Sequence, residues 1–166
     1  PNGECGFYFV TLRYVDNVAE IFAREQAERR EPKQAEVELL GQSVSVEYSP
    51  LDIGSIAQIF DGDSKTFIRT FEANPLEITL SFSQPVELRG VSMLIGNAAS
   101  RLELEVTLPD SQTPLLFTAE INPQQAYRTL GVSFGKTLQV QSLYLRLYDL
   151  DQSEPGHVHL WEVSLQ

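Results

Sequence analysis

The chain has 166 residues, of which 42% are hydrophobic and 21% are charged, a composition typical of a folded domain. Its formal net charge is −11, from 23 acidic and 12 basic residues. This charge disfavours nucleic-acid partners, whose phosphates must be neutralised by Lys and Arg, and nonspecific adhesion to anionic membranes. Calcium ions and neutral ligands such as sugars are compatible with it.

Three further features limit the setting of the protein. A single cysteine, Cys5, excludes an intramolecular disulfide, and we expect it to be a small half-buried side chain rather than a nucleophile. No stretch reaches the roughly 18 apolar residues of a membrane-spanning helix, and no signal peptide is visible. Because the chain begins with Pro-Asn rather than Met, we expect it to be part of a longer polypeptide.

The first part of the chain predicts a strand followed by a helix. Residues 7–15, FYFVTLRYV, are rich in aromatic and β-branched residues, which is typical of a strand. In the following DNVAEIFAREQAERREP, one helical face carries Val18, Ile21 and Phe22, and Pro32 ends the pattern. We expect this segment to be the tail of an upstream region or a connector.

From about residue 36 onward, the sequence predicts short strands separated by turns. In LEITLSF, one face carries Ile78, Leu80 and Phe82, and similar alternation recurs in AEVELLG, SVSVEYS, RLELEVTLP and SLYLRLYDL. Breaks are predicted at Ser83-Gln84-Pro85, Asn97, Pro109-Asp110, Asn122-Pro123 and Gly135. A period of two with regular breaks predicts an antiparallel β-sandwich or barrel. The predicted fold class is all-β with one helix at the front, divided into residues 1–45 and a β domain at 46–166.

The stretch FDGDSKTF, residues 60–67, places two aspartates, a glycine and a threonine within six residues of one another. An EF-hand loop starting at Asp61 would need an oxygen ligand and a glycine where Lys65 and Thr66 stand. A glycosidase needs two carboxylates on either side of a substrate, and Asp61 and Asp63 share one short turn. Two interpretations remain open, a calcium loop in which a tight glycine turn aims backbone carbonyls at the ion, and a plain acidic turn.

The wider sequence around this stretch, SIAQIFDGDSKTFIRTFEANPLEITLSFSQPVELRGVSML, resembles the front half of a discoidin-type domain. This family is also called the coagulation factor V/VIII C-type or galactose-binding-like domain. Its pattern D-G-d-x-x-T-x-W is matched by Asp61, Gly62, Asp63 and Thr66. The closing pattern L-R-i-…-v-x-l-x-E-i-x-v is similar to LYLRLYDLDQSEPGHVHLWEVSLQ, so the resemblance covers about residues 46–166. Where the family has Trp, this chain has Ile68, which we expect to occupy the core after some repacking.

The resemblance implies a galactose-binding-like jelly roll, which is an antiparallel β-sandwich, and a calcium site. Carried over position by position, the implied ligands are the Gln58 carbonyl, the Asp61 carboxylate, the Asp63 carbonyl, the carbonyl and hydroxyl of Thr66, the Trp161 carbonyl and the Glu162 carboxylate. Such an ion would connect the first loop to the last strand. We therefore expect calcium to stabilise the fold rather than to take part in chemistry.

The resemblance also implies where a sugar would bind. Glycan-binding members of the family hold the sugar in loops at one end of the sandwich, with an aromatic ring and a few polar or basic groups. The matching candidates in this chain are Arg69, Glu72, Asn97, Arg101 and His157.

Two other patterns have simpler structural explanations. The pair His157-x-His159 lacks identifiable further ligands for a structural zinc ion, so we expect two surface histidines beside a turn, with sugar contact as their other possible role. The row Tyr144-x-Arg146-x-Tyr148 offers rings and a cation to a ligand, but such rows commonly pack across strands.

No G-x-S-x-G sequence, Ser/His/Asp arrangement or phosphate-binding glycine loop is visible, so we expect no enzymatic activity. We expect a non-catalytic accessory domain that binds carbohydrate and is stabilised by calcium, within a larger bacterial sugar-active protein. The alternative is a protein-interaction or structural module that positions a neighbouring catalytic domain without a sugar site.

The expected partners are a glycan or other neutral ligand and the rest of the parent polypeptide, with no nucleic acid and no direct membrane insertion. The expected location is extracytoplasmic, periplasmic or at the cell surface, with a membrane-anchored parent as one option.

Overall fold

Nine β-strands, one α-helix and one 3₁₀-helix make up the described part of this computed structural model, residues 17–123, 126–152 and 156–166. In chain order the elements are α1 (Val18–Arg30), β1 (Lys33–Leu39), β2 (Gln42–Tyr48), β3 (Leu51–Ile53), η1 (Ile56–Phe60), β4 (Ile68–Thr70), β5 (Leu76–Ile95), β6 (Ser100–Thr107), β7 (Leu115–Ile121), β8 (Arg128–Asp149) and β9 (His159–Leu165). The strand predicted at residues 7–15 and Cys5 lie outside the described residues.

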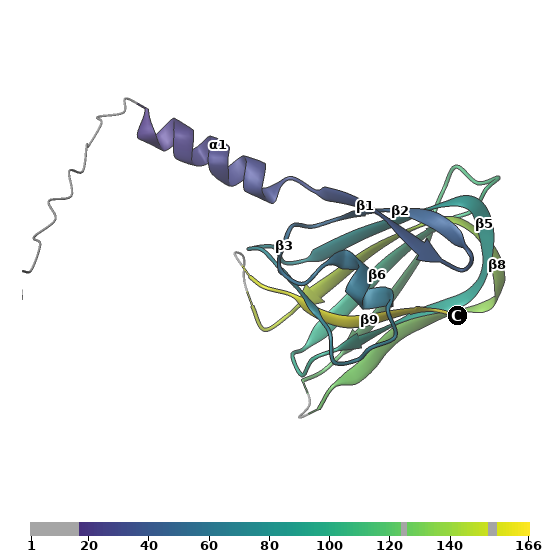
Figure 1. Ribbon diagram of the computed structural model, residues 1–166. Helices are drawn as coiled ribbons and strands as arrows, with labels where there is room; N and C mark the ends of the chain where they lie inside the picture. The colour runs from purple at the N-terminus through teal and green to yellow at the C-terminus, as the bar shows by residue number, and fades with distance from the viewer. Residues whose placement is uncertain (1–16, 124–125, 153–155) are drawn as a thin grey trace, which may run out of the picture.

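The helix α1 forms where the sequence predicts it and projects away from the strands (Figure 1). Pro32 follows the helix and cannot continue it, because proline lacks the backbone N–H and its ring clashes with the preceding turn. Its predicted apolar face lies largely in solvent, since Val18 is 64% exposed and Phe22 is 62% exposed. Near the C-terminal end of the helix, Arg30 contacts Glu72 of the strand domain at 3.4 Å. Of the helices described, neither is long and apolar enough to cross a membrane.

The strands form one open antiparallel sheet that folds into a sandwich, as the sequence predicts. Its path is β3-β4-β9-β5-β8-β6-β7, and β2 pairs with β5 and with β1. The long strands β5 and β8 curve from one layer to the other (Figure 1). Early in β5, Ile78 is paired with Leu145, and late in β5, Met93 is paired with Leu130. These two strands therefore connect both layers.

Two of the predicted strand breaks are wrong. Residues 83–85 and Gly135 lie inside β5 and β8, which continue through them. The register of β5 against β8 shifts between Ser81 and Val86, and such irregularities bend a strand without ending it. Gly135 has a φ of 72°, which most residues adopt with difficulty. The predicted breaks at Asn97, Pro109-Asp110 and Asn122-Pro123 are confirmed as connections between strands.

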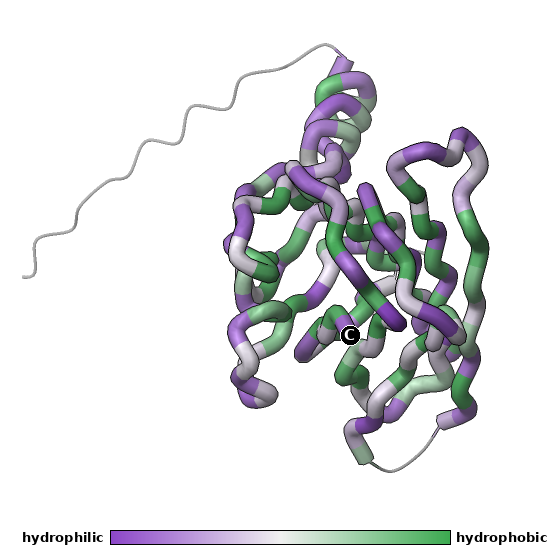
Figure 2. The backbone as a smooth tube through the Cα atoms, turned by 90° about the vertical axis from the view of Figure 1, so that its right-hand side faces the viewer, coloured by the Kyte–Doolittle hydropathy of each residue, from purple (hydrophilic) through white to green (hydrophobic). Residues whose placement is uncertain are grey.

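The alternation that predicted the strands is confirmed by their burial. In β6, buried and partly exposed residues alternate along the whole strand. Figure 2 shows the same alternation as hydrophobic and hydrophilic colours that follow one another along the strands. Ile68, at the position where the resembling family has Trp, is fully buried in the core. Burial of apolar side chains from both layers is therefore the main source of stability.

The boundary that the sequence predicts at residue 45 falls inside β2. Strand β1 pairs with β2 along its full length, from Lys33 opposite Tyr48 to Leu39 opposite Gln42. Strand β2 in turn pairs with β5. The sheet therefore includes residues on both sides of this boundary.

The turn before η1 requires glycine for two reasons, which gives a first prediction. Gly54 has a φ of 78°, and a Cβ atom there would lie 2.5 Å from the Phe67 carbonyl oxygen and 2.7 Å from Gln58 Oε1. Gly41 has the same φ, with nothing within 4 Å of a Cβ atom. We expect Gly41→Ala to cost about 1 kcal/mol of unfolding free energy from backbone strain. Gly54→Ala should cost roughly 1–3 kcal/mol more because of the clash. Urea denaturation of both variants measures this difference, and equal losses would contradict the steric argument.

The ion pair between β3 and β4 gives a second prediction. Asp52 accepts hydrogen bonds of 2.9 and 2.6 Å from Arg69. These bonds hold the pKa of Asp52 below its usual value of 3.8. Because the folded-state pKa is the lower one, ionised Asp52 stabilises the fold above the unfolded-state pKa, and this contribution is lost as the pH falls through the folded-state pKa.

The measurement is the difference in unfolding free energy between wild type and Asp52→Asn from pH 6 to pH 2. We expect a difference that is steady at the upper end and disappears at the lower end. The control is the same comparison in an Arg69→Met background, where the pH dependence should be absent. A pH-dependent difference of equal size in both backgrounds would contradict the assignment to Arg69.

Candidate functional site

A β-bulge in β9 places two consecutive side chains outside the core. Leu94 of β5 is opposite Glu162 and Ile95 is opposite Leu160, so Trp161 has no partner of its own in the ladder. Leu160 is fully buried, whereas Trp161 and Glu162 are both partly exposed. A bulge redirects side chains in this way because one extra residue interrupts the strict alternation of a strand.

Four aromatic rings gather beside this bulge. The centroid of the Trp161 ring lies 5.3 Å from that of Phe67, 6.1 Å from that of His159 and 4.8 Å from that of Tyr127. The Phe67 and His159 planes lie within 27° and 24° of the indole plane, whereas the Tyr127 plane is inclined at 62°. The rings of Phe67 and His159 are therefore oriented much like the indole of Trp161, whereas the Tyr127 ring is steeply inclined to it.

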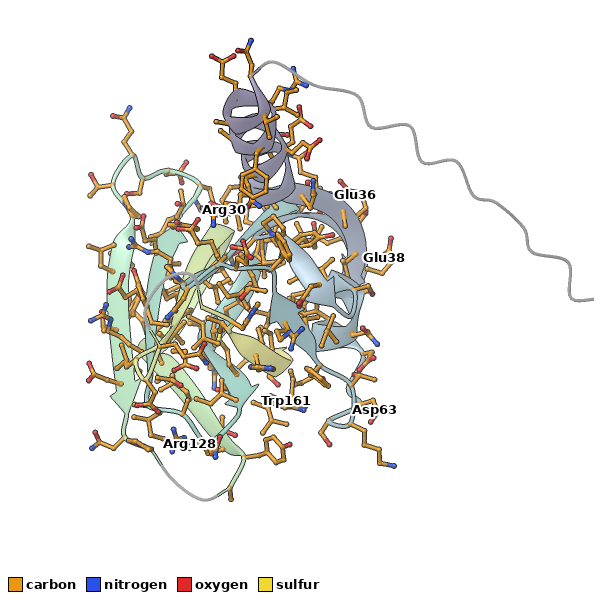
Figure 3. All side chains as sticks on the ribbon, turned by 90° about the vertical axis from the view of Figure 1, so that its left-hand side faces the viewer. Arg30, Glu36, Glu38, Asp63, Arg128 and Trp161 are labelled. Atoms are coloured by element: carbon orange, nitrogen blue, oxygen red, sulfur yellow. The ribbon has the colours of Figure 1, made fainter. Side chains whose placement is uncertain are left out.

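A hollow of about 570 Å³ opens over these rings. Its polar lining includes the side chains of Asn97, Asp149 and Gln152. The absence of a side chain at Gly96 leaves room beside the indole, since a Cβ atom there would lie 3.4 Å from the Trp161 ring. We call this hollow, lined by Phe67, Asn97, Tyr127, His159 and Trp161, the aromatic pocket. Figure 3 shows Trp161 at the end of the sandwich opposite α1.

The protonation state of His159 suits hydrogen bonding to a neutral ligand. Burial lowers the pKa of His159 below its usual value of 6.5, and the nearby cationic side chain of Arg69 acts in the same direction. The imidazole is therefore neutral at pH 7, with one nitrogen that donates a hydrogen bond and one that accepts.

The predicted metal ligands of the first loop lie close together. Thr66 Oγ1 lies 2.9 Å from the Asp63 carbonyl oxygen, 3.2 Å from a carboxylate oxygen of Asp61 and 3.4 Å from the Gln58 carbonyl oxygen. A hydroxyl group has one proton, so it can donate to one of these acceptors at a time. We call residues 58–66 the acidic loop. Three acceptor groups therefore surround one hydroxyl proton, although the Asp63 N–H also donates to Asp61 Oδ1 and the Thr66 N–H to the Asp63 carbonyl.

Glu162 of β9 adjoins this loop. Its Oε1 accepts a 3.3 Å hydrogen bond from the Gly62 N–H, and its Oε2 is buried without a hydrogen-bond partner among the residues that the structure describes. Burial raises the pKa of Glu162, and the negative charges of Asp61 and Asp63 raise it further. A nearby cation stabilises a buried carboxylate oxygen that lacks a hydrogen-bond donor.

These residues fit a calcium ion, which takes carboxylate, carbonyl and hydroxyl oxygens together. Within residues 17–123, 126–152 and 156–166, no group of three or more His, Cys, Asp and Glu side chains is arranged to hold a metal. An ion here would therefore depend on backbone and hydroxyl oxygens beside Asp61 and Glu162. The ligand role of each residue, including that of the Trp161 carbonyl, stays a prediction.

Of the residues predicted to bind a ligand, Asn97 lines the aromatic pocket and the others have protein partners. These contacts are Arg69 with Asp52, Glu72 with Arg30, Arg101 with Glu103 and the ring of Tyr148, and His157 Nδ1 with the Thr70 carbonyl oxygen at 2.8 Å. Their part in ligand binding stays a prediction. The row through Arg146 packs across strands, since its guanidinium lies 3.3 Å from Glu103 and 3.1 Å from Glu105.

Sequence reasoning did not select Phe67 or Tyr127, and it selected Trp161 only for its carbonyl. Phe67 directly follows the acidic loop, and Tyr127 directly precedes β8. An aromatic residue at the junction of a loop and a strand is the available signal, but the sequence does not show which junctions meet in space.

No protein-family model matches the sequence, and no curated protein matches it. Among solved structures, an F5/8 type C domain from Bacteroides fragilis has a TM-score of 0.58 at 14% identity, with 80% of this chain and 95% of that chain covered. The module CpGH89CBM32-5 from Clostridium perfringens, in complex with GalNAc-β-1,3-galactose, has a TM-score of 0.51 at 18% identity, with coverage of 74% and 92%.

A GH29 fucosidase from Ruminococcus gnavus in complex with fucose has a TM-score of 0.57 at 15% identity. The match covers 74% of this chain and 25% of the fucosidase, so the chain spans about a quarter of that protein. The sandwich, its open antiparallel sheet and these similarities agree with the fold that the sequence predicts. The chain has the discoidin-like, galactose-binding-like fold of F5/8 type C domains.

Proposed function

We propose that this chain is a non-catalytic domain that binds carbohydrate in the aromatic pocket. The observation that carries the proposal is the group of rings around Trp161, with amide and carboxylate side chains at its edge. Pyranose rings have an apolar C–H face that packs on aromatic rings and hydroxyl groups that need several hydrogen-bonding partners. The aromatic pocket offers both.

The polar groups at the pocket can form hydrogen bonds with sugar hydroxyl groups, and Lys65 adds a cation to the lining. Asn97 and Gln152 have amide groups that donate and accept, and neutral His159 does the same. The Asp149 carboxylate already accepts hydrogen bonds from the Asp151 N–H at 2.9 Å and Gln152 Nε2 at 2.8 Å. The complexes of CpGH89CBM32-5 with GalNAc-β-1,3-galactose and of the fucosidase with fucose support the proposal at the level of shared fold.

We further propose that calcium binds at the acidic loop and Glu162 and that this ion stabilises the fold. Bound there, it would supply positive charge to the Glu162 oxygen that lacks a donor and to the acceptors around Thr66 Oγ1. The unpartnered Oε2 of Glu162 and the crowding of acceptors around Thr66 Oγ1 support this. Because Glu162 and Gly62 are 100 residues apart in sequence, the ion would hold together distant parts of the chain.

The setting that we propose is an accessory domain of a larger, extracytoplasmic, bacterial sugar-active protein. The match to a quarter of the fucosidase supports this, since a similar sandwich there forms part of a longer chain. A second candidate function, protein docking through α1, is favoured by the exposed Val18 and Phe22 on the helix. The two functions use opposite ends of the molecule and are compatible.

Glycan binding is tested with an array screened in the presence and absence of calcium, followed by calorimetry with GalNAc-β-1,3-galactose, fucose and any array hit. We expect binding by the wild type and a loss of affinity of about tenfold or more in Trp161→Ala, because the ring face is removed. Phe22→Ala removes an exposed aromatic ring at the far end and should bind as the wild type does. If no glycan binds in the presence of calcium, the carbohydrate proposal is wrong.

Calcium binding is tested by thermal unfolding of chelator-treated protein with and without added calcium. At 100 times the dissociation constant, a ligand that binds only the folded state stabilises it by about 2.7 kcal/mol. For a domain of this size, that corresponds to a rise in melting temperature of roughly 5–10 °C. Asp61→Ala should abolish the rise, whereas Asp110→Ala, in an exposed turn elsewhere, should retain it. A wild type that does not respond to calcium or to chelator would rule out the proposed ion.

A further inference from the structure

We propose that Arg128 is the positioning residue of the aromatic pocket. In this role its guanidinium group joins the two loops that carry Asn97 and Tyr127, and so sets the distance between the polar edge and the aromatic wall. The inference rests on the carbohydrate-binding function proposed above. Figure 3 shows Arg128 and Trp161 at the same end of the sandwich.

The guanidinium group bridges two connections that are distant in sequence. Arg128 Nη1 donates a 2.5 Å hydrogen bond to the Asn122 carbonyl, just after β7, and Nη2 donates to the Ala98 carbonyl, between β5 and β6. The planar guanidinium has donors at fixed separation and direction. One side chain therefore fixes the spacing of both loops.

Both loops carry residues of the aromatic pocket next to the bonded positions. Asn97 precedes Ala98, and Tyr127 precedes Arg128 itself. The Tyr127 ring stands across the Trp161 ring at a centroid distance of 4.8 Å. Arg128 is half-buried and is not among the residues that line the pocket. It would therefore act through its neighbours and not by touching the ligand.

Arg128 differs from most of the described arginines in what it contacts. Five arginines pair with carboxylates, namely Arg24, Arg30, Arg69, Arg101 and Arg146. Among the described residues, no carboxylate pairs with Arg128, although the protein has a net charge of −11. Its partners are neutral backbone carbonyls, so the shape of the guanidinium and not its charge explains the choice of arginine. A lysine ammonium carries all its donors on one nitrogen and cannot reproduce the fork.

The loop after β5 is also held on its other side. The Ala99 N–H donates to Asp151 Oδ2 at 3.0 Å, and the Ala99 carbonyl accepts from the Leu150 N–H at 2.8 Å. This loop therefore stays attached to the sandwich without Arg128. The arginine side chain adds a connection from this fixed loop to the segment around Tyr127, beyond the ladder in which Arg128 is paired with Ile95. Its removal should displace the aromatic wall while the rest of the pocket remains.

The primary test measures acrylamide quenching of tryptophan fluorescence well below the melting temperature. Trp161 is the only tryptophan in the chain, so the signal reports the aromatic pocket directly. We expect a higher quenching constant in Arg128→Lys than in the wild type, because loss of the Tyr127 wall opens the indole to solvent. The control is Arg89→Lys, whose guanidinium donates to Thr137 Oγ1 at 3.0 Å away from the pocket. It should quench as the wild type does.

The second measurement is calorimetry with GalNAc-β-1,3-galactose, where we expect Arg128→Lys to weaken binding about tenfold because the Tyr127 ring no longer stands against the pocket. Wild-type quenching in Arg128→Lys would overturn the inference, even if the melting temperature fell, because a fall alone indicates a merely structural contact. Increased quenching in a protein whose wild type binds no glycan would support the positioning role and reject the proposed carbohydrate function.

Discussion

The β-bulge in β9 is the constraint on which both candidate sites depend. A regular strand would turn either Trp161 or Glu162 toward the core, because successive side chains point to opposite faces. The extra residue instead leaves both side chains outside, the indole among the rings of the aromatic pocket and the carboxylate beside Gly62 of the acidic loop. A slip of one residue in the pairing with β5 would separate these groups from their neighbours. The pairing of β9 with β5 therefore fixes both sites at once.

Much of the fold could be predicted because burial on one face imposes a period of two on each strand. The helix could be predicted from its own spacing and from Pro32. The failures at residues 83–85 and at Gly135 have a common cause. Glycine and proline are used where strands end and also where a strand bends, so the sequence alone does not separate a turn from a bulge. Only the pairing of β5 with β8 shows that the chain continues.

The two candidate sites differ in the same way. One is formed mostly by neighbouring residues, and the other by residues that are far apart in the sequence. The acidic loop could be predicted because most of its oxygens come from nine consecutive residues. The aromatic pocket could not, because Phe67, Tyr127 and Trp161 come from three separated segments that the sheet brings together. The partners of charged residues could not be predicted for another reason. In a protein with nearly twice as many acidic as basic residues, a predicted ligand group such as Arg69 readily finds a carboxylate of its own.

The projecting helix determines how the pocket is presented. At 1.5 Å per residue, the 13 residues of α1 span roughly 20 Å, and they leave the sandwich at the end opposite Trp161 (Figure 3). The N-terminal end of the helix therefore lies away from the sandwich (Figure 1). Val18 and Phe22 can be buried against a neighbour without covering the end that carries Trp161. The helix end can therefore be attached to a neighbour while the end with the aromatic pocket stays accessible.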